Sequence, residues 1–360
     1  MRNFIIRISR FIRRQLLKSS RYRWCVLTPA TSRETIAPLL KDYSLYAAAG
    51  KLTERKADGS ERPVDGDRLE ANRRLQHKRV VYMCNGRTVA GGFADRLKGI
   101  LSLYAISREL GYDFRISYTS PFLLEDFLPP ADYDWRIAPE ELGTEKAAML
   151  VLENTEDSDF QTHKQAEWLR RTLKEGPEVM HVITNSNYAY TLDYPALFRQ
   201  LFRTAPHLEA ALAAEGEWLQ RYVSVSARFL SMLGDFRETG ENSSLPKAEA
   251  QALMQRNLEA IERLHAAHPD HTILVNSDSM RFLAFARQLP YVKVVEGSVA
   301  HTDLMAGKGA EDAHMKLFLD FFLISRADAI YMLHTPPMRI SGFPYAASRL
   351  AGKEMQVIEL

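Results

Sequence analysis

The stretch VVYMCNGRTVAGGFADRLKGILSLYAISRELGYDFRISY, residues 80–118, decides the fold. Its first five residues are an unbroken apolar run, typical of a strand buried on both faces. A glycine-containing loop follows over residues 85–93, and an apolar pattern of helical period begins at Ala94 and ends before Gly111. Residues 113–118 alternate as a second strand. The stretch therefore predicts a β-loop-α-β unit with an amphipathic helix, whose N-terminus meets a glycine loop suited to an anion or a sugar.

The rest of the chain continues to alternate between strand and helix patterns. Alternation of this kind implies right-handed crossovers and mainly parallel sheets that bind ligands at the carboxyl ends of their strands. With a length of 360 residues, it predicts an α/β protein with two domains, residues 80–220 and 221–360, that face a shared cleft. Strands are predicted at residues 147–152, 178–184, 222–229, 272–275, 292–295, 329–333 and 355–358, and helices at 121–127, 163–173, 192–202, 206–219, 247–265, 279–288, 312–325 and 345–350.

The first 79 residues lack this pattern. Residues 2–23 carry eight Arg or Lys and no acid, and their apolar residues fall on one helical stripe. We expect residues 1–23 to form a basic amphipathic helix that lies on an anionic membrane or on the protein's own surface; a transit peptide would look similar. The longest apolar run, residues 4–6, is far below the roughly 20 residues of a spanning helix. Residues 24–79, rich in charged and small residues, are predicted to be a linker and excursion.

The overall composition is that of an ordinary globular protein. Lys and Arg number 47 and Asp and Glu 45, a balance that argues against a nucleic-acid partner. The two cysteines, Cys25 and Cys84, lie far apart, which favours a reducing compartment over a disulfide framework. We therefore expect a cytoplasmic protein, with residues 1–23 as a peripheral contact to the inner face of the membrane.

Patterns that could bind a metal ion are weak. A histidine trio is interrupted by Pro269, which breaks the helix between its members. The sequence has no G-x-S-x-G, H-E-x-x-H or C-x-x-C motif, which removes the simplest hydrolase, metalloprotease and zinc-ribbon interpretations. We expect no metal site. The trio is His265, His268 and His271, and the D-x-D spacing, common by chance, occurs at residues 65–67, 132–134 and 157–159.

An arginine and an aspartate at the ends of two predicted strands could together bind a nucleoside diphosphate. Arg228 lies at the carboxyl end of the strand that opens the second half, where a guanidinium can hold a diphosphate and stabilise charge on a leaving group. A structural salt bridge between Arg228 and Asp235 is the alternative. Asp278 follows the next strand, where a carboxylate can accept hydrogen bonds from a ribose or a guanine edge, or simply lie in the N-cap region of a helix.

A third candidate is a helix N-terminus near the end of the chain. Ser341, Gly342 and Phe343 precede a helix predicted to begin near Tyr345. Free N–H groups and the helix dipole would point at a phosphate there. Pro344 has no N–H, which is tolerable at a first helical position.

These motifs together resemble a known family. The run G-G-x-x-x-R-L-x-G-I at residues 91–100, with an aromatic-bearing helix behind it, resembles the first motif of the GDP-fucose-dependent fucosyltransferases, including nodulation-type and protein O-fucosyltransferases. The segment around Arg228 resembles the family's H-x-R-x-x-D element, with Ser226 in place of His and the acid displaced to Asp235. Ser277 and Asp278 match its Thr-Asp-Asp element, and the last 50 or so residues match its final helix-strand-Ser-x-Phe-Ser-helix element, with Pro replacing the second Ser.

The resemblance, which covers residues 80–360 by element order, implies a GT-B-type fold with two Rossmann-like domains. It also implies an inverting transfer from GDP-fucose, without a required metal, to a hydroxyl of a glycan or glycolipid, as in cell-surface polysaccharide assembly. A transferase for another nucleotide sugar, or a silent glycan-binding or membrane-associated scaffold, remains open. The implied roles are Arg228 as diphosphate clamp, Asp278 as nucleoside contact, Ser341, Gly342 and Phe343 as phosphate site, Gly91, Gly92 and Arg96 as cleft border, and Asp95 as candidate base or helix cap.

Overall fold

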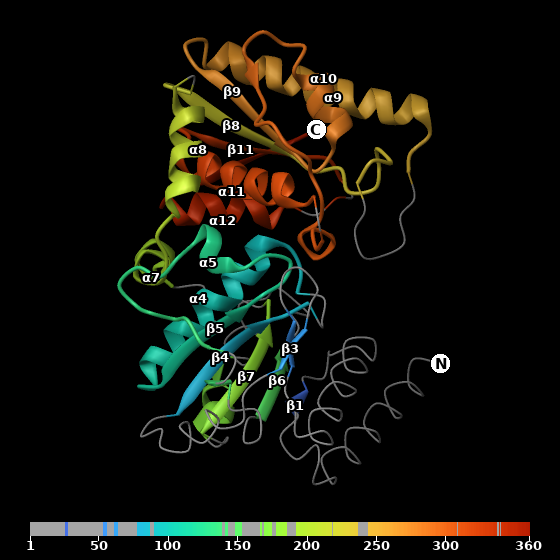
Figure 1. The fold of residues 1–360 in the computed structure, drawn as a ribbon. Coiled ribbons are helices and arrows are strands. Elements are labelled where there is room, and N and C mark those ends of the chain that lie inside the picture. The colour runs from blue at the N-terminus through green and yellow to red at the C-terminus, as the bar shows by residue number, and fades with distance from the viewer. Residues whose placement is uncertain are drawn as a thin grey trace. The chain divides into compact units, whose positions relative to one another are not determined.

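The chain divides into two compact units, each built on its own five-stranded sheet (Figure 1). The first unit comprises Met1–Gly91, Asp95–Leu124 and Pro130–Asp193, and the second comprises Gly92–Ala94, Glu125–Pro129 and Tyr194–Leu360. The computed structural model describes residues 26–27, 53–55, 61–63, 78–86, 90–138, 141–142, 148–152, 166–167, 169–174, 178–185, 192–217, 219–236, 244–307, 309–336, 338 and 340–360.

The sheet of the first unit is entirely parallel and has the strand order β1-β6-β7-β4-β5. Strand β4, between β7 and β5, is buried along its whole length, as the unbroken apolar run predicted. The sequence analysis missed β1, which lies within the predicted linker together with a separate hairpin of β2 and β3. The strands are β1 (Val26–Leu27), β2 (Thr53–Arg55), β3 (Glu61–Pro63), β4 (Arg79–Cys84), β5 (Asp113–Tyr118), β6 (Ala148–Leu152) and β7 (Val179–Thr184).

Helix α4 (Phe93–Glu109) connects β4 to β5, as predicted, and the residues that are not buried, Asp95, Lys98, Ala105, Arg108 and Glu109, lie on one side of it. The buried residues of the helix include Ser102 and Ser107, and Ser107 Oγ donates to the carbonyl of Leu103 within the helix. Gly99 allows this burial, because a Cβ at that position would lie 2.5 Å from the carbonyl oxygen of Thr184 in β7. The glycine therefore lets the helix lie directly against the end of a strand.

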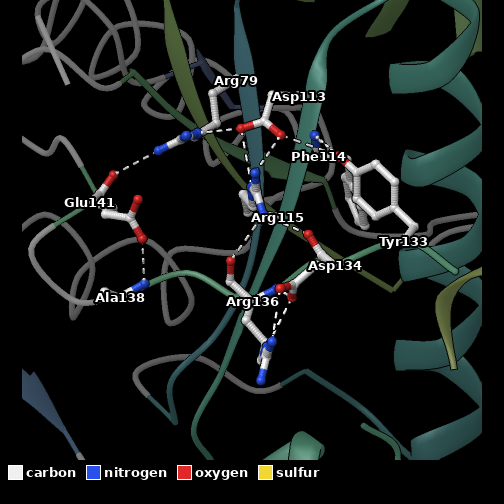
Figure 2. Close-up of polar contacts among 9 residues, drawn as sticks. All are labelled: Arg79, Asp113, Phe114, Arg115, Tyr133, Asp134, Arg136, Ala138 and Glu141. Atoms are coloured by element: carbon white, nitrogen blue, oxygen red, sulfur yellow. Dashed lines mark hydrogen bonds and ion pairs between the residues drawn. The ribbon is translucent and has the colours of Figure 1, made fainter. Parts of the chain in front are cut away.

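A polar network joins the amino ends of β4 and β5 to the segment that follows α5 (Leu124–Phe127), as Figure 2 shows. Asp113 is its centre: one carboxylate oxygen lies 2.6 Å from Arg79 Nε, and both oxygens pair with the guanidinium of Arg115. Tyr133 Oη donates to the same carboxylate over 3.2 Å and accepts from the amide of Phe114. One acid thus pairs with the buried Arg79 and the partly buried Arg115, and it fixes this segment to the edge strand.

Asp113→Asn is expected to lower the free energy of unfolding by about 2 kcal/mol, because two arginines lose the charge of their shared partner. Asp134→Asn is the matched control, since the Asp134–Arg136 pair is exposed (56% and 57%) and exposed pairs contribute roughly 0–1 kcal/mol. Urea denaturation of both variants measures the difference. Equal losses in the two variants would contradict the central place of Asp113.

The second unit has a second parallel sheet, with the order β10-β9-β8-β11-β12. Helices α9 and α10 cover one face and share a core with β8, β9 and β11, while α8, α11 and α12 form a layer on the other face (Figure 1). The strands are β8 (Tyr222–Ala227), β9 (Thr272–Ser277), β10 (Val292–Lys293), β11 (Ile330–His334) and β12 (Met355–Glu359). The helices are α7 (Tyr194–Leu201), α8 (Pro206–Gly216), α9 (Lys247–Ala267), α10 (Met280–Ala286), α11 (Glu311–Arg326) and α12 (Gly342–Leu350), with a 3-10 turn at Thr302–Leu304.

The core of the second unit contains many aromatic rings. Phe318 of α11 stacks on Phe127 with ring centroids 4.4 Å apart, and Phe93 contacts both Phe318 and Phe321 edge-on. Helices α7 and α8, which the sequence analysis placed at the end of the first domain, pack on α12 and α11. Their apolar residues are therefore part of the second core.

The predicted basic helix at residues 1–23 lies outside the described residues. Among the residues that the structure does describe, none of the helices combines the length and the hydropathy needed to cross a membrane.

Candidate functional site

The second sheet places Arg228 where a parallel sheet of this order binds ligands. From β8 the chain first adds β9 on one side and later β11 on the other, so the direction of strand addition reverses between β8 and β11. Ligands of open α/β sheets bind at the carboxyl ends of strands at such a point. Arg228 directly follows β8, is partly buried, and stands opposite the end of β11 in the strand register.

Asp278 lies beside Arg228, at the end of the neighbouring strand β9. Both of its carboxylate oxygens accept backbone hydrogen bonds, from the amides of Phe229 and Leu230, over 2.8 Å each. Burial raises the pKa of Asp278 to about 6, although these hydrogen bonds and the charge of Arg228 favour the ionised form. The structure therefore brings the two predicted residues together but engages Asp278, the predicted nucleoside contact, with the protein backbone.

Asp235, the predicted alternative partner of Arg228, bonds to the start of α10. Its Oδ2 accepts from Ser279 Oγ over 2.9 Å and from the amide of Arg281 over 2.7 Å. The acid therefore links the loop after β8 to the start of α10.

The N-terminus of α12 lies seven residues beyond the end of β11. Ser341 is its N-cap, and Ser341 Oγ accepts from the amide of Phe343 over 3.4 Å. The helix begins at Gly342, so the predicted start near Tyr345 was wrong by three residues. Gly342 and Phe343 therefore lie in the first turn, where amides and the helix dipole favour an anion.

Three buried polar atoms near the carboxyl ends of the second sheet have no hydrogen-bond partner among the described residues: Ser226 Oγ, Asn276 Oδ1 and Thr335 Oγ1. Each residue is at most 6% exposed, and Ser226 and Asn276 occupy paired positions of β8 and β9. Buried polar groups are normally paired, so these atoms are available to a water molecule or a ligand. Sequence reasoning missed Asn276 and Thr335, and the signal that could have found them is a polar residue at the end of a buried strand.

In the first unit, the glycine loop brings Asp95 close to the end of β7. Gly91 has φ +77°, and a Cβ there would lie 3.2 Å from Asp95 Oδ2 and 3.5 Å from Asn185 Nδ2. Asp95 is 44% exposed, lies in the first turn of α4 and pairs with Lys98 over 2.9 Å. Gly92 directly precedes α4 and groups with the second unit. Asn185, which directly follows β7, was not identified from the sequence.

Arg96, predicted to border the ligand cleft, is 2% exposed. Its Nε donates to the carbonyl of Gly91 over 2.9 Å, and its Nη1 donates to Tyr118 Oη over 2.8 Å and to the carbonyl of Ser120 over 2.9 Å. Nη1 also contacts Cys84 Sγ at 3.2 Å. The guanidinium therefore ties the glycine loop to the carboxyl ends of β4 and β5.

The patterns considered for metal binding have other partners. His268 Nε2 bonds to Tyr331 Oη over 2.7 Å, His271 pairs with Asp328, and His265 stacks on the ring of Tyr291. Within the described part of the chain, no group of three or more His, Cys, Asp or Glu residues could hold a metal ion. The D-x-D patterns at residues 65–67 and 157–159 lie outside that part.

Comparison with known proteins identifies the fold. No family model matches the sequence, and no curated protein matches it either. Among solved structures, a mutant of Arabidopsis thaliana FUT1 in complex with GDP has a TM-score of 0.51 and 13% sequence identity, and the match covers 91% of this chain and 79% of FUT1.

Two further structures show lower similarity. The fucosyltransferase NodZ from Bradyrhizobium has a TM-score of 0.49 and 13% identity over 77% of this chain and 92% of NodZ. POFUT1 in its apo form has a TM-score of 0.46 and 12% identity over 78% of this chain and 97% of POFUT1. Of these three structures, FUT1 has the TM-score above 0.5 and supports the assignment of the fold. The α/β architecture with two parallel sheets is therefore the GT-B-type fold of these enzymes, and the fold predicted from the sequence is confirmed.

Proposed function

We propose that the chain is a glycosyltransferase that transfers fucose from GDP-fucose to a hydroxyl of a glycan or glycolipid, as in the assembly of a cell-surface polysaccharide. The observation that carries the proposal is the position of Arg228, at the carboxyl end of β8 where the strand order reverses. A guanidinium there suits two adjacent phosphates, because its planar donors match their oxygens. The FUT1 structure with the same fold contains GDP.

In the proposed reaction, an acceptor hydroxyl oxygen attacks the anomeric carbon of the sugar as the bond from that carbon to the phosphate oxygen breaks. Negative charge then develops on the departing GDP, and Arg228 would stabilise it, assisted by the first-turn amides of α12. The acceptor proton must pass to a base, and partly exposed Asp95 is our candidate. We infer no required metal cofactor.

Arg228→Ala is expected to weaken GDP-fucose binding about 30-fold, because a hydrogen bond to a charged group contributes about 1.5–3 kcal/mol. Isothermal titration of the purified full chain measures this directly. A thermal-shift screen against GDP, UDP, CMP and GDP-fucose tests the nucleotide, since a selective ligand at a hundredfold excess over Kd stabilises the protein by about 2.7 kcal/mol. Arg256→Ala is the matched control, because Arg256 lies exposed on α9 of the same unit.

The screen also separates the alternatives. Stabilisation by UDP alone would leave the phosphate site in place and exclude fucose as the donor sugar. No stabilisation by any nucleotide would favour a silent glycan-binding or membrane-associated scaffold. The proposed contact of residues 1–23 with the inner face of a membrane, and with it a cytoplasmic location, is tested by liposome sedimentation of the chain with and without these residues.

A further inference from the structure

The turn that follows Arg228 is held by Asp278, which directly follows the neighbouring strand β9. The amides of Phe229 and Leu230, the two residues after Arg228, donate to Oδ1 and Oδ2 of Asp278 over 2.8 Å each. One carboxylate therefore fixes two consecutive peptide units directly next to the arginine. The acid and the turn are about 50 positions apart in the sequence, so this bond is a feature of the folded unit.

A second acid, Asp235, connects the loop after β8 to the start of α10. Asp235, at the far end of the same loop, accepts from Ser279 Oγ and from the amide of Arg281. Ser279 is the N-cap of α10, and its hydroxyl accepts from the amide of Phe282 over 3.0 Å. The loop after β8 and the loop after β9 thus each supply one carboxylate that bonds to the other segment. Of these two acids, Asp278 is the one that bonds to the turn beside Arg228.

This turn needs external support, because its backbone is unfavourable on its own. Leu230 has φ 52°, in the left-handed region that residues with a Cβ rarely adopt. Its amide is one of the two that Asp278 holds. A conformation of this kind persists where surrounding interactions fix it, often at functional sites.

We propose that Asp278 is a positioning residue, which fixes the Phe229–Leu230 turn and thereby orients the Arg228 guanidinium toward the diphosphate of a nucleotide sugar. This rests on the proposed function, in which Arg228 binds that diphosphate. Pre-orienting an arginine reduces the entropy lost on binding, so the carboxylate contributes to affinity without contacting the ligand.

The charge state of Asp278 supports this role. Arg228 is the charged group that lowers the pKa of Asp278, and Asp235 on the loop after β8 bonds to the amide of Arg281 on α10. Because burial raises its pKa to about 6, Asp278 gains a proton at mildly acidic pH. A protonated carboxyl has a hydroxyl in place of one acceptor oxygen and can no longer hold both amides.

The test compares Asp278→Asn with Asp235→Asn as the matched control, by titration with GDP-fucose at pH 7.5. Asparagine has only one side-chain acceptor, so Asp278→Asn is expected to weaken binding about tenfold. Both α10 contacts of Asp235 go to one oxygen, Oδ2, so Asp235→Asn keeps an acceptor for them and leaves both turn bonds intact, and Kd should stay within about twofold. The double variant Asp278→Asn/Arg228→Ala should bind no worse than Arg228→Ala alone, because Asp278 acts through the arginine.

A pH profile provides a readout that does not depend on the folding of Asp278→Asn. Both phosphates of GDP-fucose are diesters, so the ligand lacks the second phosphate ionisation near pH 6. Wild-type affinity is expected to fall about fivefold as the pH is lowered from 7.5 to 5 through the pKa of Asp278, whereas Arg228→Ala and Asp278→Asn should give flat profiles.

The outcomes separate the two hypotheses. If wild type binds GDP-fucose but its affinity is independent of pH, or if the losses of the two single variants multiply in the double variant, Asp278 does not act through Arg228. If wild type binds no nucleotide at any pH, the proposed function fails, and the role of Asp278 fails with it.

Discussion

Lys316→Met is expected to lower the free energy of unfolding by about 4 kcal/mol, because it leaves a buried carboxylate without its counter-ion. Lys316 lies on α11 and its side chain is 2% exposed; its Nζ lies 3.0 Å from Asp320 Oδ2 and donates to the carbonyl of Val295 over 2.9 Å. The side chain of Asp320 is 11% exposed, and burial raises its pKa. Urea denaturation near pH 7 measures the loss.

Two controls distinguish this pair from an ordinary helical ion pair. Arg326→Met, on the same helix, removes the pair with Glu209, which is 46% and 48% exposed, and should cost less than about 1 kcal/mol. Lys316→Met combined with Asp320→Leu should recover most of the loss, because the buried charge is then absent. If the double variant were as unstable as Lys316→Met, the loss would come from packing and not from charge.

The loss in Lys316→Met also depends on pH. The folded pKa of Asp320 is raised above its ordinary value by burial, and removing Lys316 removes the charge that lowers it. The folded state then binds a proton more readily than the unfolded state, so stability rises as the pH falls through the folded pKa. The difference between wild type and Lys316→Met should therefore become smaller under acidic conditions.

This pair illustrates what the sequence predicts and what it does not. The periodic run of α11 predicts a helix, and the structure places it within one or two residues of that prediction. A Lys and an Asp four positions apart are typical of an exposed helix face, so their burial could not be predicted. Burial arises because α8 and α12 pack on α11, which itself covers the sheet, and those contacts join distant parts of the sequence.

The candidate site, too, could be predicted from the sequence only in part. Arg228 and Asp278 were each predicted to lie at the end of a strand of the second half, and the structure brings them together. The bonds of Asp278 to the turn after β8 could not be predicted, because they depend on a loop conformation with a left-handed Leu230. The early start of α12 was missed because Gly342 and Pro344 suggest a turn, although Ser341 is a good N-cap.

Arg96→Met is expected to cost about 4 kcal/mol of unfolding free energy, because a buried guanidinium that donates three hydrogen bonds is lost. The guanidinium donates to the carbonyls of Gly91 and Ser120 and to Tyr118 Oη, and it lies over the Tyr118 ring at 5.4 Å. Methionine matches the aliphatic part of the side chain but donates nothing. Arg96→Lys keeps the charge, but because a single ammonium cannot reproduce the planar fork it should recover only part of the loss.

Arg108→Met is the matched control, since Arg108 lies exposed in the last turn of the same helix, with its guanidinium over the ring of Tyr104 at 5.7 Å. An exposed cation–π contact contributes about 0.5–1 kcal/mol, so this variant should remain close to wild type. Denaturation of both variants in urea, with comparison of their m-values, makes the measurement. A loss below about 1 kcal/mol in Arg96→Met, together with weaker GDP-fucose binding, would mean that Arg96 contacts the ligand as the sequence predicted and does not hold the glycine loop. A large loss of stability would instead identify the arginine of the G-G-x-x-x-R motif as the tie between that loop and the ends of β4 and β5.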